Sequence, residues 1–321
     1  MTAYLLRRVA TLLPLLVCLS IFTFALGHLA PVDTARSLAL LETGGSPPSQ
    51  ELIDAIANEY GLDDPAVVQY WRWAGGAVRG DLGRSFTSGQ PVTASLRHAF
   101  PVTLQLGLLA FLIVLAVGIP LGVAAAVGQG RLPDHALRLF SVVGASLPSY
   151  WFGYLLVVVF SVRLDLFPTS GIASPSAYVL PAITLALVVT SVIVRITRAS
   201  MLDALGEQFI GRARAGGVPE RRIIVRHALR VALNPVVTYG GLVLSALLGG
   251  SIFVERVFDM PGVGRLGVDS IQRSDLPTVQ GFVLLTGTIV LVVNLLVDLL
   301  YVRLDPRVRL AGNEGQAGRA F

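Results

Sequence analysis

The sequence contains no lysine, because all 25 of its basic residues are arginine. A phosphate-binding loop of the G-x-x-x-x-G-K-[ST] type needs a lysine that reaches the terminal phosphates of ATP. The chain lacks that residue, so this class of ATPase site is excluded. Cysteine is nearly absent too: Cys18 is the single one and lies in an apolar run. One cysteine forms neither a disulfide framework nor a cysteine metal site, and we interpret Cys18 as a small buried hydrophobe.

Charge is also scarce. Charged residues make up 14% of the 321 residues, hydrophobic residues make up 54%, and the mean hydropathy is +0.71. Soluble domains carry about a quarter of their residues as charges, and a helix crosses the bilayer core with about 20 apolar residues. Six stretches reach that length without Asp, Glu or Arg: residues 9–32, 99–130, 139–162, 166–194, 231–254 and 276–297. We expect an all-α membrane protein with six transmembrane helices, the fourth beginning near Ala177.

The positions of the arginines predict the orientation of these helices. Cytoplasmic loops carry an excess of basic residues. Arginines precede the first span, flank the loop near residue 131, crowd the loop between residues 195 and 230, and follow the last span. Both termini are therefore expected in the cytoplasm, with residues 33–98 outside. A cleaved signal peptide is the alternative for the first run, but that run exceeds the usual length of about 7 to 15 apolar residues.

The outer insert, residues 33–98, contains two predicted helices. Ser49 has the chemistry of a helix cap, and Gly61 ends the helix that follows it. A second short helix covers residues 65–80 and carries Tyr70, Trp71 and Trp73. Such aromatic side chains favour the headgroup level of a bilayer, so we expect this helix to lie along the outer surface. The insert is interpreted either as scaffold or as a docking site.

A basic segment, "GRARAGGVPERRIIVRHALR", separates the fourth and fifth spans at residues 211–230 and holds six arginines. Residues 203–215 have helix-forming composition, and Gly216 and Gly217 interrupt them. Pro219 then suits a first helical position, so the segment predicts a helix, a glycine elbow and a second helix. Three functions compete: contact with anionic lipid, binding of nucleic acid, and docking of another protein. Lipid contact does not explain the double glycine, and no aromatic platform for nucleic acid is present.

The spans contain few polar groups. Gln105, Asn234 and Asn294 are the candidates for a transport path, because polar side chains in spans usually face the bundle interior. No span carries a zinc pair, paired aspartates or a nucleophile with its base, which argues against an intramembrane enzyme. An ATP-independent secondary transporter of small solutes is the alternative function, although internal repeats and ionisable groups at mid-membrane, common in that class, are not evident. The sequence predicts no metal site.

These features together resemble a known family. The stretches "YLLRRVATLLPLL", "HLAPVD", "YGLDDPAVVQYWRWAGGAVRGDLGRSF", "SLPSYWFGYLLVVVFSVRLDLFPTSG", "RASMLDALGEQFIGRARAGG", "GGSIFVERVFDMPGVGRL" and "NLLVDLLYVRLDPRVR" run through almost the whole chain. They resemble the inner-membrane permease subunits of ABC importers for dipeptides, oligopeptides and nickel, in the branch of the first of the two paired dipeptide permeases. The resemblance implies a type I ABC importer permease fold.

In that family the cytoplasmic segment is the coupling loop, which docks on a separate ATPase subunit. The resemblance places it at about residues 199–230, with the docking part at 206–230 and contacts or shape determinants at Glu207, Arg212, Ala213, Arg214, Gly217 and Arg222. The general pattern of such loops begins with Glu and ends with Pro. Here Gly211 and Arg230 occupy those two positions.

The resemblance also implies a division of labour. It predicts a second homologous permease subunit, two ATP-binding subunits that hold ATP and magnesium, and an extracytoplasmic solute-binding protein. This chain is then expected to bind membrane lipid but no cofactor and no nucleic acid, to catalyse no reaction, and to lie in a prokaryotic inner membrane. The cargo is expected to be a dipeptide, an oligopeptide or a related solute such as a nickel complex. We expect three parts: residues 1–98 (first helix and outer subdomain), 99–304 (five-helix core) and 305–321 (cytoplasmic tail).

Overall fold

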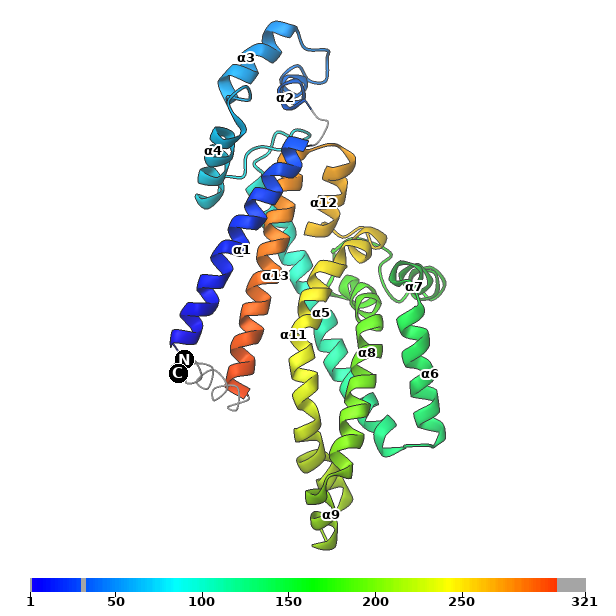
Figure 1. Ribbon diagram of the computed structural model, residues 1–321. Coiled ribbons are helices and arrows are strands. Elements are labelled where there is room, and N and C mark those ends of the chain that lie inside the picture. The colour runs from blue at the N-terminus through cyan, green and yellow to red at the C-terminus, as the bar shows by residue number, and fades with distance from the viewer. Residues whose placement is uncertain (1, 30–32, 305–321) are drawn as a thin grey trace, which may run out of the picture. The chain divides into compact units, whose positions relative to one another are not determined.

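The computed structural model describes residues 2–29 and 33–304, and its regular elements are helices (Figure 1). The expected tail, residues 305–321, lies outside the described residues. In chain order the elements are α1 (Thr2–Leu29), α2 (Thr34–Glu42), α3 (Gln50–Tyr60), α4 (Ala66–Val78), α5 (Val92–Val127), α6 (Leu132–Ser146), α7 (Ser149–Leu156), the π-helix η1 (Val157–Arg163), the 3₁₀-helix η2 (Pro175–Tyr178), α8 (Val179–Gly206), α9 (Gln208–Ala215), α10 (Glu220–Arg222), the π-helix η3 (Ile223–Ala228), α11 (Leu229–Val257), α12 (Val263–Gln272) and α13 (Leu276–Leu304).

Five of these helical stretches are long and apolar enough to cross a membrane, and a sixth span exists if one bent pair is counted as a single crossing. The third expected span, residues 139–162, is not one straight helix. It is divided into Leu132–Ser146 and Ser149–Arg163, which meet at 105°. Pro148 causes the break, because it has no backbone N–H to donate and it disfavours the helical conformation of the residue before it. Leu147 is accordingly extended, with ψ at 128°.

The described residues fall into two compact units. The first lies within Met1–Thr103 and Pro261–Leu291, and the second lies within Leu104–Met260 and Val292–Phe321. Two long helices, α5 and α13, each contribute one end to each unit. The first unit thus holds the insert of residues 33–98, and the second holds the basic segment.

In the first unit, α1 and α13 pack side by side and antiparallel (Figure 1). The Cα of Gly27 lies against Gln280, and lower on the same pair Gly287 lies against Leu19. Glycine at both levels allows the two helices to approach closely. Antiparallel first and last spans are what an even number of crossings requires.

Cys18 of α1 is exposed, so its interpretation as a buried residue was wrong. Only 6% of the apolar window of α1 is buried within the chain. Side chains on such a helix face the hydrocarbon of the bilayer, and apolarity there reflects lipid contact rather than a protein core.

The insert of residues 33–98 folds as expected at its first predicted helix. The hydroxyl of Ser49 accepts from the backbone N–H of Leu52 at 3.3 Å and caps α3, and Gly61 ends it with φ at +60°. Ala35 and Ala39 of α2 pack with Ile56 of α3 to form a small buried cluster. The second predicted helix is α4, which begins after Pro65.

A buried carboxylate holds the loop between α4 and α5 in the first unit. Asp275, which is 2% exposed, accepts four hydrogen bonds. Three come from the loop: from the hydroxyl of Ser85 at 2.5 Å, from the backbone N–H of Phe86 at 2.9 Å, and from the hydroxyl of Thr87 at 2.8 Å. The fourth comes from Thr278 at 2.9 Å. One side chain therefore fastens a segment 190 residues away in sequence.

In the second unit α8 is the central helix, with 67% of its apolar window buried. Small residues let its neighbours approach. A Cβ on Gly118 of α5 would lie 2.8 Å from Ile193, and one on Gly122 would lie 2.5 Å from Thr197. These contacts use close backbone packing, which is how helices associate inside a membrane.

Two polar contacts cross between helices of the second unit. Asp134, at the start of α6, accepts from Nε of Arg198 at 2.6 Å and from its Nη2 at 2.8 Å, and it also accepts the backbone N–H of Gly130. The Asp134 side chain is 2% exposed. This two-point ion pair joins the turn before α6 to α8. On the other side of the unit, Ser245 of α11 donates to Asn294 of α13 at 3.2 Å.

Candidate functional site: the elbow between α8 and α11

The segment between α8 and α11 forms a helical elbow, defined here as residues 206–230, at the far end of α8 and α11 (Figure 1). The expected helix over residues 203–215 is interrupted: α8 ends at Gly206, and α9 begins at Gln208. Glu207 between them is extended, with ψ at 146°. Glycine weakens a helix and exposes its backbone, which allows the chain to change direction there.

The end of α9 shows why the double glycine is present. Gly217 has φ at +74°, the left-handed conformation that side chains disfavour. Its N–H donates to the carbonyl of Arg214 at 3.0 Å, and the N–H of Val218 donates to the carbonyl of Ala213 at 3.1 Å. These two bonds make a Schellman motif, which satisfies the last carbonyls of a helix. Ala213 and Gly217, both predicted as contacts or shape determinants, take part in this motif.

The second arm of the elbow differs from the expectation. Pro219 is the cap of the next helix, not its first helical residue. One short turn, α10, passes into the π-helix η3 before regular α-helix resumes at Leu229. Single π-turns inside helices occur frequently at functional sites, and this one stands where the elbow joins a membrane span. No composition or spacing in the sequence marked it.

An ion pair closes the elbow across the glycines. Arg214 donates from Nε to one carboxylate oxygen of Glu220 at 3.1 Å and from Nη2 to the other at 2.7 Å. The carboxylate, by accepting these bonds, raises the pKa of the Arg214 guanidinium. The pairing of Glu220 with Arg214 was not predicted from the sequence. The sequence does contain a signal for this pairing, because Glu220 follows Arg214 by six residues and lies beyond the two glycines.

Apolar contacts anchor the elbow to the ends of three long helices. Ile210 of α9 and Ile223 of η3 are fully buried, as is Met201 of α8. They pack in one cluster with Ala126 of α5 and with Ala204, Ala228 and Ala232. The elbow is therefore continuous with the helix ends above it, and a displacement of the elbow must move those ends. Ile210 and Ile223 carry this link and were not singled out from the sequence.

The predicted docking residues lie on the surface of this anchored elbow. Glu207, Arg212, Arg214 and Arg222 are exposed, Gly217 is exposed at the tip, and Ala213 is half-buried. Arg221, Arg226 and Arg230 are exposed as well. Arg214 is the one member of the six arginines with an ion-pair partner among the described residues. The others present a cluster of positive charge to the surroundings.

The structure does not bring the predicted pathway residues together at one point. Asn234 belongs to an exposed stripe of α11 whose members recur every three or four residues: Val231, Asn234, Thr238, Leu242, Ala246, Gly250 and Phe253. Gln105 lies on an exposed face of α5. The Asn294 side chain accepts from Ser245, which gives it a part in joining α11 to α13.

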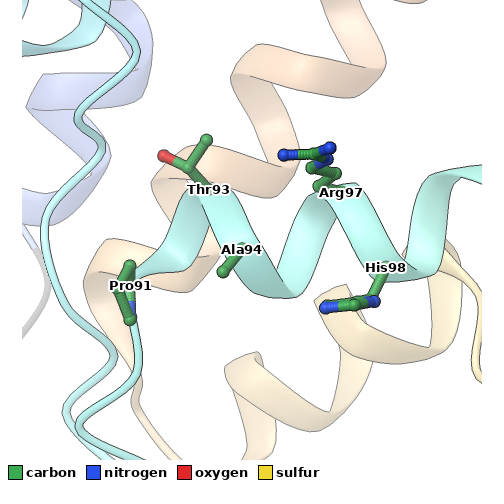
Figure 2. Close-up of a pocket in the computed structure, with 5 residues that line it drawn as sticks. All are labelled: Pro91, Thr93, Ala94, Arg97 and His98. Atoms are coloured by element: carbon green, nitrogen blue, oxygen red, sulfur yellow. The ribbon is translucent and has the colours of Figure 1, made fainter.

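The first unit contains a surface hollow of about 540 Å³ at the start of α5 (Figure 2). Pro91, Thr93, Ala94, Arg97 and His98 line it. Arg97 and His98 extend from the same helix turn, and both are exposed. The Arg97 guanidinium can pair with an anionic group.

Comparison with known proteins identifies the family. Residues 118–310 match the model of the "Binding-protein-dependent transport system inner membrane component" family, and residues 1–107 match the model of its N-terminal part. The chain belongs to this family. It is therefore an inner-membrane transport permease.

Relatives of this permease match it from end to end. A peptide transport system permease protein of Brucella abortus (strain 2308) is 41% identical over 317 residues, covering 96% of this chain and 99% of the relative. The glutathione transport system permease protein GsiC of Escherichia coli (strain K12) is 39% identical over 309 residues, with the same coverage. Both are named as permeases, and neither name refers to catalysis.

Solved structures support the fold of the permease. Inward-facing MetNI methionine ABC transporter is similar over 65% of this chain and 96% of that chain, with a TM-score of 0.56 and 20% identity. An amino acid ABC transporter with histidines gives a TM-score of 0.51 at 17% identity, over 66% and 94% of the two chains. The expected ABC importer permease fold is confirmed.

Proposed function

We propose that the chain is the permease subunit of an ATP-driven importer whose cargo is a peptide or a related small molecule such as glutathione. The full-length likeness to relatives named for peptide and for glutathione transport supports this cargo class. The chain itself catalyses no reaction and binds no cofactor; ATP and magnesium are held by partner subunits. The lack of lysine, which excludes a phosphate-binding loop of the usual kind, agrees with this division.

The observation that carries the mechanism is the anchored elbow. An ATPase partner that pulls or rotates residues 206–230 acts on Ile210 and Ile223, and through them on the ends of α5, α8 and α11. The elbow is closed by the Schellman motif and by the Arg214–Glu220 pair, so it moves as one body. Nucleotide-dependent movement of such a body biases a bundle between two arrangements, which is how alternating access arises.

The charge of the elbow suits a protein partner. Its exposed arginines, Arg212 and Arg222 among them, offer guanidinium groups that pair with carboxylates at two points. Glu207 offers the opposite charge at the start of α9. We assign these residues to the contact with the ATPase, while Ala213, Arg214 and Gly217 give the elbow its shape.

The exposed stripe of α11 is the proposed meeting surface of the pathway. In the single chain it is uncovered over its whole length, and it combines small and polar residues such as Asn234, Thr238 and Gly250 with Leu242. A second homologous permease packed opposite would enclose a path between the two stripes. Gln105 on α5 and Asn294 on α13 are the other proposed pathway residues, and an extracytoplasmic binding protein would deliver the cargo.

Substitutions at Gly217 test the elbow. A Cβ added at Gly217 would meet open space, so a side chain there costs only the left-handed backbone, about 1–2 kcal/mol per non-glycine residue. We expect Gly217→Val to lose ATP-driven uptake into cells or vesicles while its membrane insertion stays normal. Gly217→Asn should keep most uptake, because asparagine tolerates this conformation. Gly211→Ala is the matched control, since Gly211 is equally open but lies within α9.

The possible outcomes distinguish a failure of the elbow mechanism from a failure of the proposed ATP-driven function. Undiminished uptake by Gly217→Val would contradict the elbow mechanism. Uptake by the unmodified importer that runs on a proton gradient and needs no ATP would instead contradict the ATP-driven function and favour a secondary transporter. Copurification of the ATPase subunits with Gly217→Val is measured in parallel. Loss of copurification shows that docking is lost, and retained copurification without uptake shows that movement of the ATPase is no longer transmitted to the permease.

A further inference from the structure

Helix α4 carries an apolar stripe that no described residue of its unit covers. Val67, Trp71 and Val78 are 67%, 68% and 89% exposed. With the half-buried Ala74 they follow one another at spacings of four, three and four residues, which places them on a single face of a helix. Val68, beside this face, is 46% exposed. Exposed apolar surface of this extent and regularity indicates an interaction face.

The neighbouring face of α4 rests on the transmembrane helix α1 (Figure 1). The hydroxyl of Tyr70 is 2.9 Å from the hydroxyl of Ser20. The ring of Phe24 packs against Tyr70 at 5.6 Å and against Trp73 at 6.0 Å between centroids. These contacts fix α4 to α1 at two levels of the span.

The level of those contacts gives the depth of α4. The apolar span of α1 runs from Ala10 to His28. With a rise of about 1.5 Å per residue, Phe24 lies about 6 Å and Ser20 about 12 Å inside the His28 end. Helices that lie in a membrane interface bury their apolar face by about 5–10 Å. Tyr70 therefore contacts α1 within its apolar stretch, near the His28 end of that stretch.

The polar side of α4 is directed elsewhere. Arg72 donates to the carboxylate of Asp64 at 2.6 Å and to the backbone carbonyl of Tyr60 at 2.9 Å, which ties it to the loop after α3. Gln69 donates to the backbone carbonyls of Leu62 and Asp64. One side of α4 is thus bound to the polar insert, one side to α1, and the third, apolar side is free.

We propose that α4 is an interfacial membrane helix, with the stripe Val67, Trp71, Ala74 and Val78 buried among lipid acyl chains at the His28 end of α1. The stripe continues the exposed apolar surface of α1, where Ile21 and Phe22 are 50% and 58% exposed. Lipid is the occupant that suits this surface, because α1 is an apolar span with only 6% of its apolar window buried within the chain. The insert is thereby fastened to the membrane by α4, independently of which solute the importer carries.

Spin labels at single cysteines test the proposal. Cys18→Ser removes the one native thiol, and Val67→Cys, Trp71→Cys or Val78→Cys then places a nitroxide on the stripe of the full chain. Ala55→Cys is the control, because Ala55 is exposed on α3 of the same insert. Each labelled protein is reconstituted in phosphatidylcholine vesicles. Collision of the label with oxygen, which concentrates in hydrocarbon, is compared with collision with a water-soluble nickel chelate.

We expect the oxygen-to-nickel collision ratio at the three stripe positions to be severalfold higher than at position 55. A high nickel collision rate at the stripe would show that it faces water, and would overturn the proposal. Low rates for both reagents would show that another protein surface covers it, and would overturn it too. Three independent positions guard against one label disturbing the fold, and an unchanged size-exclusion profile confirms that each variant is intact.

Discussion

The loop before α5 should open when its buried carboxylate is removed. Asp275 accepts three hydrogen bonds from Ser85, Phe86 and Thr87, and this carboxylate is 2% exposed. Asp275→Ala removes all three at once, together with the bond from Thr278. The perturbation is local, because the substituted residue lies in the turn before α13 and the affected segment is a single loop.

The magnitude follows from the type of bond. A hydrogen bond to a charged group contributes about 1.5–3 kcal/mol, and three or four together reach the limit of about 4–5 kcal/mol that single substitutions rarely exceed. Part of the lost hydrogen-bond free energy is recovered, because Thr87 is exposed and its freed hydroxyl can form a hydrogen bond with water. We expect Asp275→Ala to lower the free energy of loop opening by about 4 kcal/mol. Asp275→Asn keeps an acceptor oxygen but lacks the charge, and about 2 kcal/mol is expected.

Trypsin offers a direct measurement. The Arg84–Ser85 bond lies beside the anchored residues, and Arg84 is exposed. Where opening is faster than cleavage, the rate of cutting follows the population of the open form. Each 1.4 kcal/mol corresponds to a factor of ten in an equilibrium constant, so a decrease of about 4 kcal/mol in the free energy of opening raises the population of the open form about 700-fold. Cleavage after Arg79, outside the hydrogen-bonded cluster, serves as the internal control, and fragments are quantified by mass spectrometry.

Two results would refute the reasoning. If Asp275→Ala is cut after Arg84 at the rate of the unmodified protein, the carboxylate does not hold the loop. If cleavage after Arg79 rises equally, the whole insert has loosened and the effect is not local. Asp63→Ala removes an exposed carboxylate from the same insert and should change neither rate.

Two further predictions concern the second unit. Arg198→Lys keeps the charge beside Asp134 but loses the two-point geometry, so we expect it to lower the thermal denaturation midpoint. Arg195→Lys, on the exposed face of the same helix, is the control and should lower the midpoint less. Equal midpoints for the two variants would contradict the importance of the pairing. Arg214→Glu and Glu220→Arg, each alone, place like charges across the elbow and should reduce ATP-driven uptake, while the two combined should restore it. A combined variant as impaired as the single ones would mean that Arg214 acts by touching the partner, not by closing the elbow.

Local chemistry predicted several elements correctly. Ser49 and Gly61 bound α3 because a hydroxyl acceptor and a glycine satisfy helix ends wherever they occur. The glycine elbow was also predicted, and Gly217 has the left-handed backbone that only glycine adopts freely. These are properties of a few consecutive residues, and no distant part of the chain is needed to decide them.

The errors arose where an apolar pattern permits more than one geometry. The run over residues 139–162 is equally apolar as a straight helix or as one broken at Pro148, and hydropathy alone does not distinguish them. Cys18 was interpreted as buried because apolar surroundings were equated with a protein core, whereas α1 faces lipid. The depth of α4 was similarly undetermined, since aromatic residues suit any level near the headgroups.

The sequence by itself determined that this protein crosses a membrane, that it holds no phosphate-binding lysine, and that a basic elbow bounded by glycines lies between two of its spans. Composition and short-range backbone preference settle such properties, because each depends on residues that are neighbours in the chain. The tertiary structure alone decided that Ile210 and Ile223 join the elbow to three helix ends, that Arg198 holds Asp134, and that Tyr70 contacts Ser20. Those contacts join residues that only folding brings together, and many pairings of similar chemistry were open to the unfolded chain.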